Sequence, residues 1–180
     1  QVNNFKLVEN ENATFVRLNI YPDGGVARLR LFGDLIPFSQ DLSKDIELSA
    51  LKNGGKIIGY NNAHYGNVNA LLSEGRGTTM GDGWETRRRR IPGHDFIIIE
   101  LGKSGLISSI EIDTCHFKGN FPDRASIQTI DLKNENDKLK AIESSSEWQF
   151  LLGEKKCKAD YIHSFGKDDL LHEKTVSHIR

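Results

Sequence analysis

Residues 95–114 read Asp-Phe-Ile-Ile-Ile-Glu-Leu-Gly-Lys-Ser-Gly-Leu-Ile-Ser-Ser-Ile-Glu-Ile-Asp-Thr, and this stretch carries the clearest indication of the fold. The apolar run 96–99 is unbroken, which is typical of a strand buried on both faces. Gly102-Lys103-Ser104-Gly105 then supplies turn residues, and an apolar-rich segment resumes at Leu106. The stretch therefore predicts two strands, 95–101 and 106–114, joined by a short turn.

Further strands are predicted on both sides of this pair. Residues 34–52 could hold one or two short helices, with Asp45 as a cap for a turn through Leu51. Residues 134–140 form a charged loop by their composition. Strand patterns occur at 56–60, 125–132, 147–152, 161–165 and 175–180. About eight strands with little helix predict an all-β chain, an antiparallel β-sandwich.

The N-terminal residues predict a strand–turn–strand unit. Residues 13–21 alternate between apolar and polar side chains, and residues 26–32 alternate again. Pro22-Asp23-Gly24-Gly25 between them is turn chemistry, because proline presets one dihedral angle and glycine allows positive φ. Residues 13–17 and 176–180 also share a small–hydroxyl–aromatic–β-branched–Arg pattern, which indicates a domain-sized repeat.

Length and charge limit the classes of function. The chain has 180 residues and a formal net charge of -1, which suits one domain and a fraction and disfavours a strongly basic nucleic-acid binder. No segment approaches the roughly 20 apolar residues that a membrane span needs. The N-terminal residues lack the pattern of a signal peptide. We therefore expect a cytoplasmic protein, or a peroxisomal one at full length, with neither nucleic acid nor membrane as partner.

Cysteine and metal motifs are sparse. Cys115 and Cys157 cannot form a disulfide framework, and reduced thiols are favoured over a bridge. The sequence contains no Cys-x-x-Cys, His-Glu-x-x-His, EF-hand or phosphate-loop spacing. We therefore expect no metal and no cofactor.

A long loop over residues 61–90 is the first candidate for chemistry. A segment of this length without strand periodicity is usually functional in a compact domain. It ends in Gly81-Asp82-Gly83-Trp84-Glu85-Thr86-Arg87-Arg88-Arg89-Arg90, which sets an aromatic face beside a carboxylate and several guanidinium groups. Arginine forks suit a carboxylate or a ureido oxygen. A solvated basic loop in which Trp84 closes the mouth of the sandwich is the alternative interpretation.

A second candidate segment follows the predicted strand that ends at Thr114. Asp113 and His116 could act together as an acid–base pair, and histidine titrates near neutrality. Alternatively, Asp113 only caps the turn that follows the strand. His64 lies in the long loop and is a lesser candidate, because a lone loop histidine is usually a surface residue.

Three segments resemble those of the allantoicase family: Val16–Arg30, Met80–Arg88 and Glu111–Pro122. The Asn53-Gly54-Gly55 and His64-Tyr65-Gly66 segments add to the resemblance. The family hydrolyses allantoate to ureidoglycolate and urea in purine breakdown. Its members carry two repeats, each resembling a jelly-roll β-sandwich of the galactose-binding or discoidin-like type.

The resemblance also implies a domain organisation. Residues 1–33 look like the closing hairpin of a first repeat, and residues 34–180 look like a second repeat without its own closing hairpin. The hairpin could complete this sandwich or that of another chain, so we expect a homo-oligomer. Catalysis by this chain alone would fail if the site needs both repeats.

The resemblance and the residue chemistry together assign roles to the candidates. Arg87 or Arg88 would clamp the substrate carboxylate, and Glu85 would act as base or ureido acceptor. His116 with Asp113 would form the acid–base pair. The remaining substrate-binding candidates are Trp84 as a packing wall, Asn120 and His64.

A non-catalytic function stays open as the alternative. Residues 95–102 and 107–112 also resemble the core of discoidin-like modules, which bind ligands or mediate oligomerisation without chemistry. The charge-dense segment from Trp84 to Arg88 argues against a sugar lectin, which would be expected to present aromatic residues and few charges.

Overall fold

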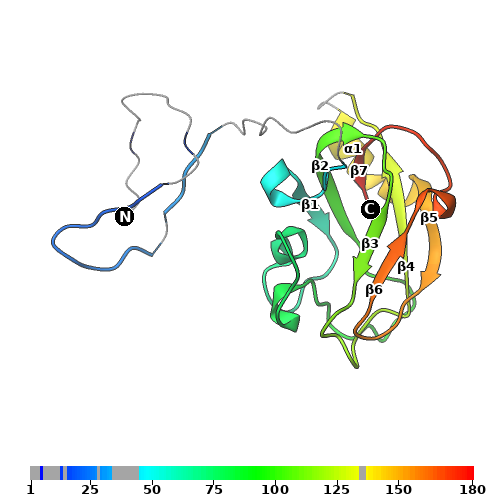
Figure 1. Cartoon of the computed structure of the whole chain (residues 1–180), viewed down its shortest axis with the longest axis horizontal. Coiled ribbons are helices and arrows are strands. Elements are labelled where there is room, and N and C mark those ends of the chain that lie inside the picture. Colours follow the sequence, from blue (N-terminus) through cyan, green and yellow to red (C-terminus); the bar gives the residue numbers. More distant parts are fainter. Residues whose placement is uncertain (1–4, 6–12, 14–15, 28, 34–44, 134–136) are drawn as a thin grey trace. The chain divides into compact units, whose positions relative to one another are not determined.

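The computed structural model describes residues 5, 13, 16–27, 29–33, 45–133 and 137–180 (Figure 1). The chain divides into two compact units, Gln1–Phe38 and Ser39–Arg180. Every helix and strand in the described residues belongs to the second unit. In chain order these elements are η1 (Leu51–Asn53), β1 (Lys56–Tyr60), η2 (Val68–Leu72), η3 (Met80–Asp82), β2 (Ile97–Gly105), β3 (Ile110–Asp113), β4 (Arg124–Ile130), α1 (Lys138–Glu143), η5 (Ser145–Glu147), β5 (Gln149–Lys156), β6 (Ile162–Phe165), η6 (Lys167–Asp169) and β7 (Val176–Ile179).

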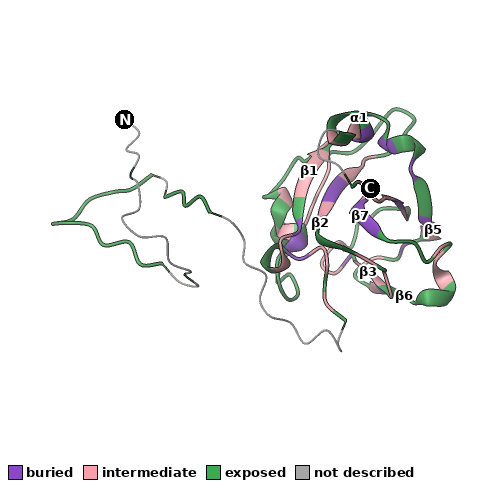
Figure 2. Ribbon diagram, turned by 90° about the horizontal axis from the view of Figure 1, so that it is seen from above, coloured by how far each residue is buried: buried purple, intermediate pink, exposed green. Residues whose placement is uncertain are grey.

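The strands form two antiparallel sheets. The larger has the order β1-β2-β7-β4-β5, and the smaller consists of β3 and β6. β3 and β6 lie in a layer of their own, in front of the larger sheet in Figure 1 and apart from β7 in the view from above in Figure 2. The all-β prediction is confirmed, with antiparallel pairing throughout.

β2 explains why the apolar run beginning at Phe96 marks the fold. Ile98 and Ile99 are adjacent and point to opposite faces, yet each is at most 5% exposed. The strand has β1 on one side and β7 on the other, and both of its faces are covered. The prediction of a strand buried on both faces is confirmed.

The core beside β2 is closed by a short helix that the sequence reading missed. Ala141 of α1 packs with Ile98 and Trp148 in one buried cluster. The indole Nε1 of Trp148 donates to the main-chain oxygen of Ala141 at 3.0 Å, so the buried indole keeps a hydrogen bond. The charged loop predicted over 134–140 is therefore wrong from Lys138 onward, because Ala141 and its neighbours have an apolar surface to pack against.

The predicted turn at Gly102–Gly105 is also wrong, since β2 continues through it to Gly105. Glycine is needed at 102 for a different reason: a Cβ there would lie 1.8 Å from the main-chain oxygen of Asn53. The main-chain N–H of Gly102 donates to the main-chain oxygen of Leu48 at 2.9 Å, which ties β2 to the segment before η1. Gly102 therefore permits two backbone segments to touch.

The cap predicted at Asp45 is replaced by another contact. η1 begins after Ala50, without a side-chain cap, and ends at Gly54 in the left-handed conformation. Asp45 instead accepts a hydrogen bond from Ser108 Oγ at 2.5 Å. The part of the expected helical region before residue 45 lies outside the described residues.

The first unit does not form the predicted strand–turn–strand in its described residues. Residues 16–27 and 29–33 contain no strand, and large side chains such as Tyr21 and Phe32 are more than four-fifths exposed. Gly24 does adopt the positive φ expected of the turn. A two-stranded hairpin is marginal unless it packs against further structure, which accounts for the absence of pairing.

No helix in the described residues is long and apolar enough to cross a membrane.

Candidate active site

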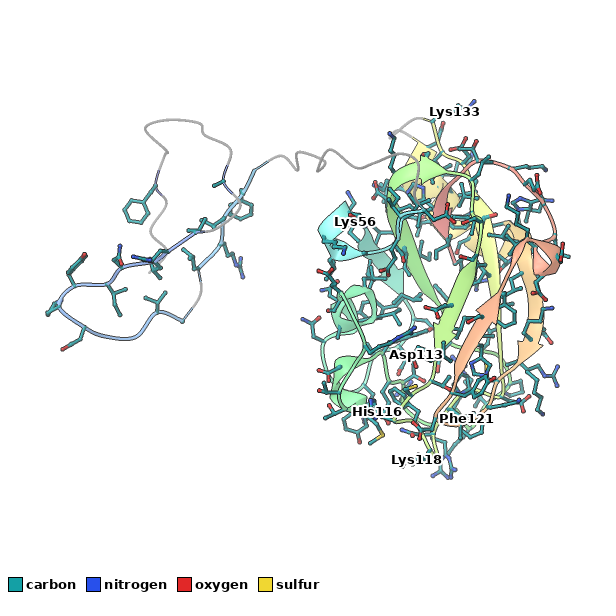
Figure 3. All side chains as sticks on the ribbon, viewed as in Figure 1. Lys56, Asp113, His116, Lys118, Phe121 and Lys133 are labelled. Atoms are coloured by element: carbon teal, nitrogen blue, oxygen red, sulfur yellow. The ribbon has the colours of Figure 1, made fainter. Side chains whose placement is uncertain are left out.

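The two candidate segments meet at one end of the second unit, where Asp113, His116, Lys118 and Phe121 are labelled in Figure 3. His64 donates its main-chain N–H to the main-chain oxygen of Glu85 at 2.9 Å. Gly66 and Gly83 make the loop packing close: an added Cβ would lie 3.1 Å from Gly81 O and from a ring carbon of Phe117, respectively. The long loop is thus pressed against the segment after β3.

Glu85 is the side chain that joins the two segments. Its Oε1 atom accepts a hydrogen bond from Asn120 Nδ2 at 2.5 Å. Glu85 is half-buried, and its backbone is bridged to Tyr65. Three predicted site residues, Glu85, Asn120 and His64, therefore lie together.

Trp84 is held by a residue that sequence reasoning did not select. Its indole Nε1 donates to the main-chain oxygen of Asn62 at 2.8 Å, and the Asn62 side-chain oxygen accepts from Arg87 N at 2.9 Å. Asn61 ties the base of the loop in the same way, because its side-chain oxygen accepts from Phe96 N at 2.9 Å. Asn62 thus orients both Trp84 and the backbone of the arginine run, and Asn61 fixes the base of the loop to Phe96.

The four arginines differ in their surroundings. Arg87, Arg88 and Arg90 are exposed. Arg89 forms an ion pair with Asp95 at 2.8 Å. Burial raises the pKa of Asp95, but hydrogen bonds from Arg89, Thr86 and Asn61 and the Arg89 charge outweigh it, so the net shift is downward. Arg87 and Arg88 therefore remain available to a ligand, whereas Arg89 braces the loop.

Asp113 and His116 do not form the expected direct pair. Asp113 accepts from Arg76 at 3.1 Å and from Cys115 N at 2.7 Å. Burial raises the pKa of this carboxyl, but the bonds from Cys115 and Arg76 and the Arg76 charge hold it below its usual range. The turn-capping alternative thus describes its contacts, since Asp113 binds the backbone two residues ahead.

His116 is anchored at two other points. Its ring Nε2 lies 2.9 Å from the main-chain oxygen of Gly77, and its main-chain N–H donates to Asp160 Oδ1 at 2.7 Å. The residue has a φ of 73°, which non-glycine residues adopt rarely. Asp160 therefore supports an unusual backbone conformation that turns the imidazole toward Gly77.

Arg76, Gly77, Asn62 and Asp160 were all missed from the sequence. Arg76 lies 35 and 37 residues from its partners Glu111 and Asp113, and Asp160 lies 44 residues from His116. Such contacts depend on tertiary structure and leave no local pattern. The one visible signal was Arg76, a lone arginine between Gly75 and Gly77.

The described residues contain no group of three or more His, Cys, Asp or Glu that could hold a metal ion. Cys115 and Cys157 are both free. Burial, with a smaller effect of the Asp123 charge, raises the pKa of the Cys157 thiol. The acid–base groups and the arginines are thus the chemical resources of this end of the molecule.

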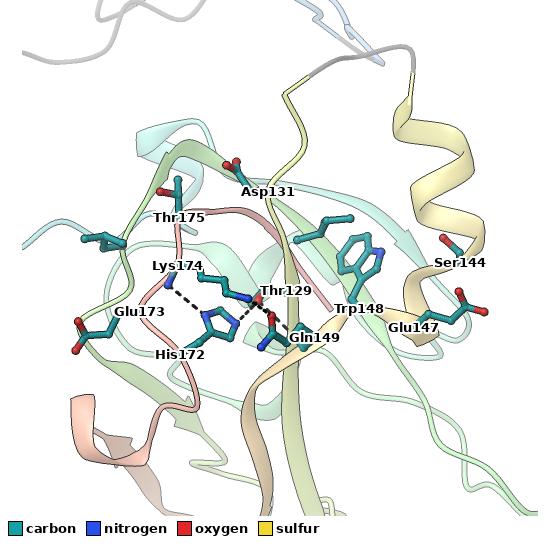
Figure 4. Close-up of a pocket in the computed structure, with 12 residues that line it drawn as sticks. Thr129, Asp131, Ser144, Glu147, Trp148, Gln149, His172, Glu173, Lys174 and Thr175 are labelled. Atoms are coloured by element: carbon teal, nitrogen blue, oxygen red, sulfur yellow. Dashed lines mark hydrogen bonds between the residues drawn. The ribbon is translucent and has the colours of Figure 1, made fainter.

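A cavity of about 760 Å³ lies elsewhere, between β4, the start of β5 and the segment before β7 (Figure 4). His172 Nε2 bonds with Thr129 Oγ1 at 3.1 Å, and Lys174 Nζ donates to Gln149 Oε1 at 2.8 Å. None of the predicted site residues lines this cavity. Four of its polar side chains are paired with one another in these two bonds, so the loop cluster around Glu85 is the stronger candidate for chemistry.

Comparison with known proteins assigns the sequence to a family. Residues 1–36 and 46–180 match the family described as "Allantoicase: Allantoicase repeat". The chain belongs to the allantoicase repeat family. Relatives include the "Probable allantoicase" of Acinetobacter baumannii (strain SDF), 52% identical over 167 residues, 93% of this chain and 49% of that protein. The "Probable allantoicase" of Rhizobium meliloti (strain 1021) is 44% identical over 168 residues, 92% of this chain and 49% of that protein.

Solved structures agree with this assignment. Allantoicase from Saccharomyces cerevisiae has a TM-score of 0.62 at 34% identity, covering 74% of this chain and 37% of that one. A second allantoicase structure has a TM-score of 0.62 at 36% identity, covering 74% of this chain and 38% of that one. The chain spans about half the length of the curated relatives it matches.

Proposed function

We propose that this chain carries an allantoicase active site and hydrolyses allantoate to ureidoglycolate and urea. The observation that carries the proposal is the Glu85–Asn120 bond, which joins the loop of His64, Arg87 and Arg88 to the segment that carries His116, in a chain of the allantoicase repeat family. A catalytic carboxylate, an imidazole and unpaired guanidinium groups at one end of a sandwich suit an anionic substrate with ureido groups.

Allantoate is a central carbon that bears one carboxylate and two ureido groups. Hydrolysis forms a bond from that carbon to the oxygen of water and breaks the bond to one ureido nitrogen. The proton that water loses balances the proton that the leaving nitrogen gains. The site must therefore hold the carboxylate, move one proton and fix the ureido oxygens.

The residues divide these tasks by their surroundings. Arg87 and Arg88 clamp the carboxylate, because they are the exposed forks nearest Trp84. Glu85 accepts a ureido N–H with one carboxylate oxygen, while Asn120 donates to the other oxygen, Oε1. His116 moves the proton. Trp84 is a wall, and His64 binds through its exposed ring.

Asp113 acts through Arg76 and the turn after β3 rather than on substrate. Its carboxylate is engaged by Arg76 and Cys115 N. Removing it would leave Arg76 with Glu111 as its acceptor among the described residues.

The finer architecture is also a proposal. We propose a jelly-roll sandwich of the galactose-binding type, in which residues 34–180 are one repeat and residues 1–33 are the closing hairpin of a preceding one. We also propose that the protein is a homo-oligomer. Its compartment would be the cytoplasm, or the peroxisome at full length, and the free cysteines accord with a reducing compartment.

Urea release from allantoate by the purified chain tests the function. We expect urea at a rate proportional to protein, and a shift of melting temperature with allantoate. Binding with no urea would favour the non-catalytic alternative, and neither urea nor binding would overturn the proposal. The variant Glu154→Gln is a matched control for carboxylate changes, because Glu154 is an exposed residue of β5 paired with Arg124.

A further inference from the structure

The contact between His116 and Gly77 defines which ring nitrogen carries the proton. Nε2 of His116 lies 2.9 Å from a main-chain carbonyl oxygen, which can only accept a hydrogen bond. Nε2 must therefore be protonated whenever this contact exists. In the neutral ring the lone pair is then on Nδ1.

Nδ1 of His116 is open. The contact to Gly77 is the only hydrogen bond of the ring among the described residues. Nδ1 is also absent from the buried polar atoms that lack a partner, so solvent or a small ligand can reach it. The imidazole thus presents a proton acceptor with a defined direction.

His163 shows the contrasting arrangement. Its Nδ1 lies 2.9 Å from Ile112 O, and its Nε2 accepts from Lys158 N at 2.9 Å. Both nitrogens are used, and the residue is buried. His163 is a structural residue, whereas His116 has one nitrogen fixed and one free.

Arg76 fixes the carbonyl that His116 binds. Its guanidinium donates to Asp113 at 3.1 Å and to both oxygens of Glu111 at 3.0 Å, so residue 76 is fastened to β3. On the other side, Asp82 accepts from the main-chain N–H groups of Thr78 and Thr79 at 2.9 and 3.0 Å. The Gly77 carbonyl lies between these two attachments.

We propose that Arg76 is a positioning residue, which holds Gly77 so that His116 keeps its proton on Nε2 and accepts the proton of the attacking water at Nδ1. The tautomer and the role of Arg76 stand on geometry, and only the catalytic use of Nδ1 rests on the proposed function. In that step water gives a proton to Nδ1 as its oxygen bonds to carbon, and the same proton passes to the leaving ureido nitrogen. No other reactant is consumed.

The matched control for Arg76 is Arg124. Arg124 is similarly exposed and also bridges two carboxylates, Asp123 and Glu154, neither of which is hydrogen-bonded to His116 or Gly77 in the described residues. Exposed ion pairs contribute little to stability, so Arg76→Gln and Arg124→Gln should both stay folded. A difference between them then reports on Gly77 and His116 rather than on general stability.

Nitrogen-15 NMR of the full chain reads the ring directly, in alkaline solution where the imidazole is neutral. In the parent and in Arg124→Gln we expect the Nε2–H tautomer, with an Nε2 proton that exchanges slowly enough to be seen. In Arg76→Gln we expect that proton to exchange at least about tenfold faster, since its acceptor is no longer held. A parent ring protonated on Nδ1, or equal exchange in both variants, would overturn the proposal.

Kinetics with allantoate add an independent arm. Arg76→Gln should lower kcat about tenfold with KM changed less than about threefold, Arg76→Lys should recover part of it, and Arg124→Gln should match the parent. His116→Gln keeps an N–H for Gly77 but has no basic nitrogen, so its kcat should fall at least about a hundredfold. Absence of urea from the parent would refute the proposed function, while the NMR arm would still decide the tautomer and the role of Arg76.

Discussion

Asn120 Nδ2 donates to Glu85 Oε1 at 2.5 Å, and this bond joins two loops that are 35 residues apart in the chain. An amide can hold one oxygen of a carboxylate while the other stays available to a ligand. The pair therefore orients Glu85 without neutralising it.

Glu85→Gln should keep the bond to Asn120, since an amide oxygen also accepts, but it removes the negative charge. We expect kcat for urea release to fall at least about a hundredfold while the melting temperature changes little. Asn120→Asp should cost both activity and stability, because it sets two carboxylates at hydrogen-bond distance. Activity of Glu85→Gln within a factor of ten of the Glu154→Gln control would remove Glu85 from the site.

Arg87→Met and Arg88→Met test the carboxylate clamp. Each should raise KM for allantoate about tenfold or more, because a charge-assisted hydrogen bond to the substrate is lost. The main-chain bond from Arg87 N to Asn62 does not depend on the side chain and should persist. Arg90→Met is the control, and the clamp would lie elsewhere if it raised KM as much.

Gly102→Ala should destabilise the chain strongly. The new Cβ would lie 1.8 Å from Asn53 O, so β2 and the turn after η1 would have to separate. We expect a loss of about 1–3 kcal/mol, read as a lower melting temperature. Gly153→Ala in β5 meets no atom within 4 Å and should be nearly neutral. Equal melting temperatures for the two variants would contradict the close backbone contact.

Acidification should weaken the fold through Asp95. The pKa of Asp95 is lower in the folded chain than its ordinary value, so its stabilising effect is complete above about pH 4 and is lost as the pH falls through the folded value. Asp95→Asn should therefore show a smaller drop in melting temperature between about pH 6 and pH 3. Melting curves of the parent and of Asp95→Asn at the two pH values measure this, and equal drops in the two proteins would contradict the role of Asp95.

Deleting residues 1–33 tests their proposed role as a closing hairpin. If they complete a sandwich in this chain or another, the truncated protein should melt at a lower temperature or contain a different number of chains per particle. Light scattering and a melting curve are sufficient. A truncated protein with the same number of chains per particle and an unchanged melting temperature would rule out both versions.

Strands were predictable where burial leaves a local pattern. The run through Ile98 and Ile99 located β2, because a strand covered on both faces needs no alternation. Helix α1 was not predictable from its charged residues. Its buried residue Ala141 packs against Trp148 of the neighbouring segment, and that contact leaves no local pattern. The turn assigned to Gly102 failed because glycine served a close backbone contact there, and composition does not distinguish the two uses.

The candidate site followed the same division. Glu85 lies in a segment of unusual composition and Asn120 in one that resembles the allantoicase family, so both could be selected, and the structure joins them. Arg76 and Asp160 act on His116 from distant parts of the chain through single contacts, which leave no spacing to detect. Asp113 was assigned to His116 because the two are close in sequence. Its carboxylate instead accepts from the main-chain N–H of Cys115 and from the guanidinium of Arg76.

The partner that orients His116 is a main-chain oxygen, and this shapes how the protein can vary. No single side-chain substitution deletes the carbonyl of Gly77. Substitutions at most neighbouring positions should therefore leave the orientation of the imidazole unchanged. Inactivating changes should instead concentrate where the path of the backbone is altered, as insertions or deletions within 76–82 or bulky replacements at Gly77, whose Cβ would lie 3.2 Å from Asp82. A deep mutational scan should therefore find this loop strict in length and tolerant of side-chain changes except at Arg76, Gly77 and Asp82, whose contacts set the path of its backbone.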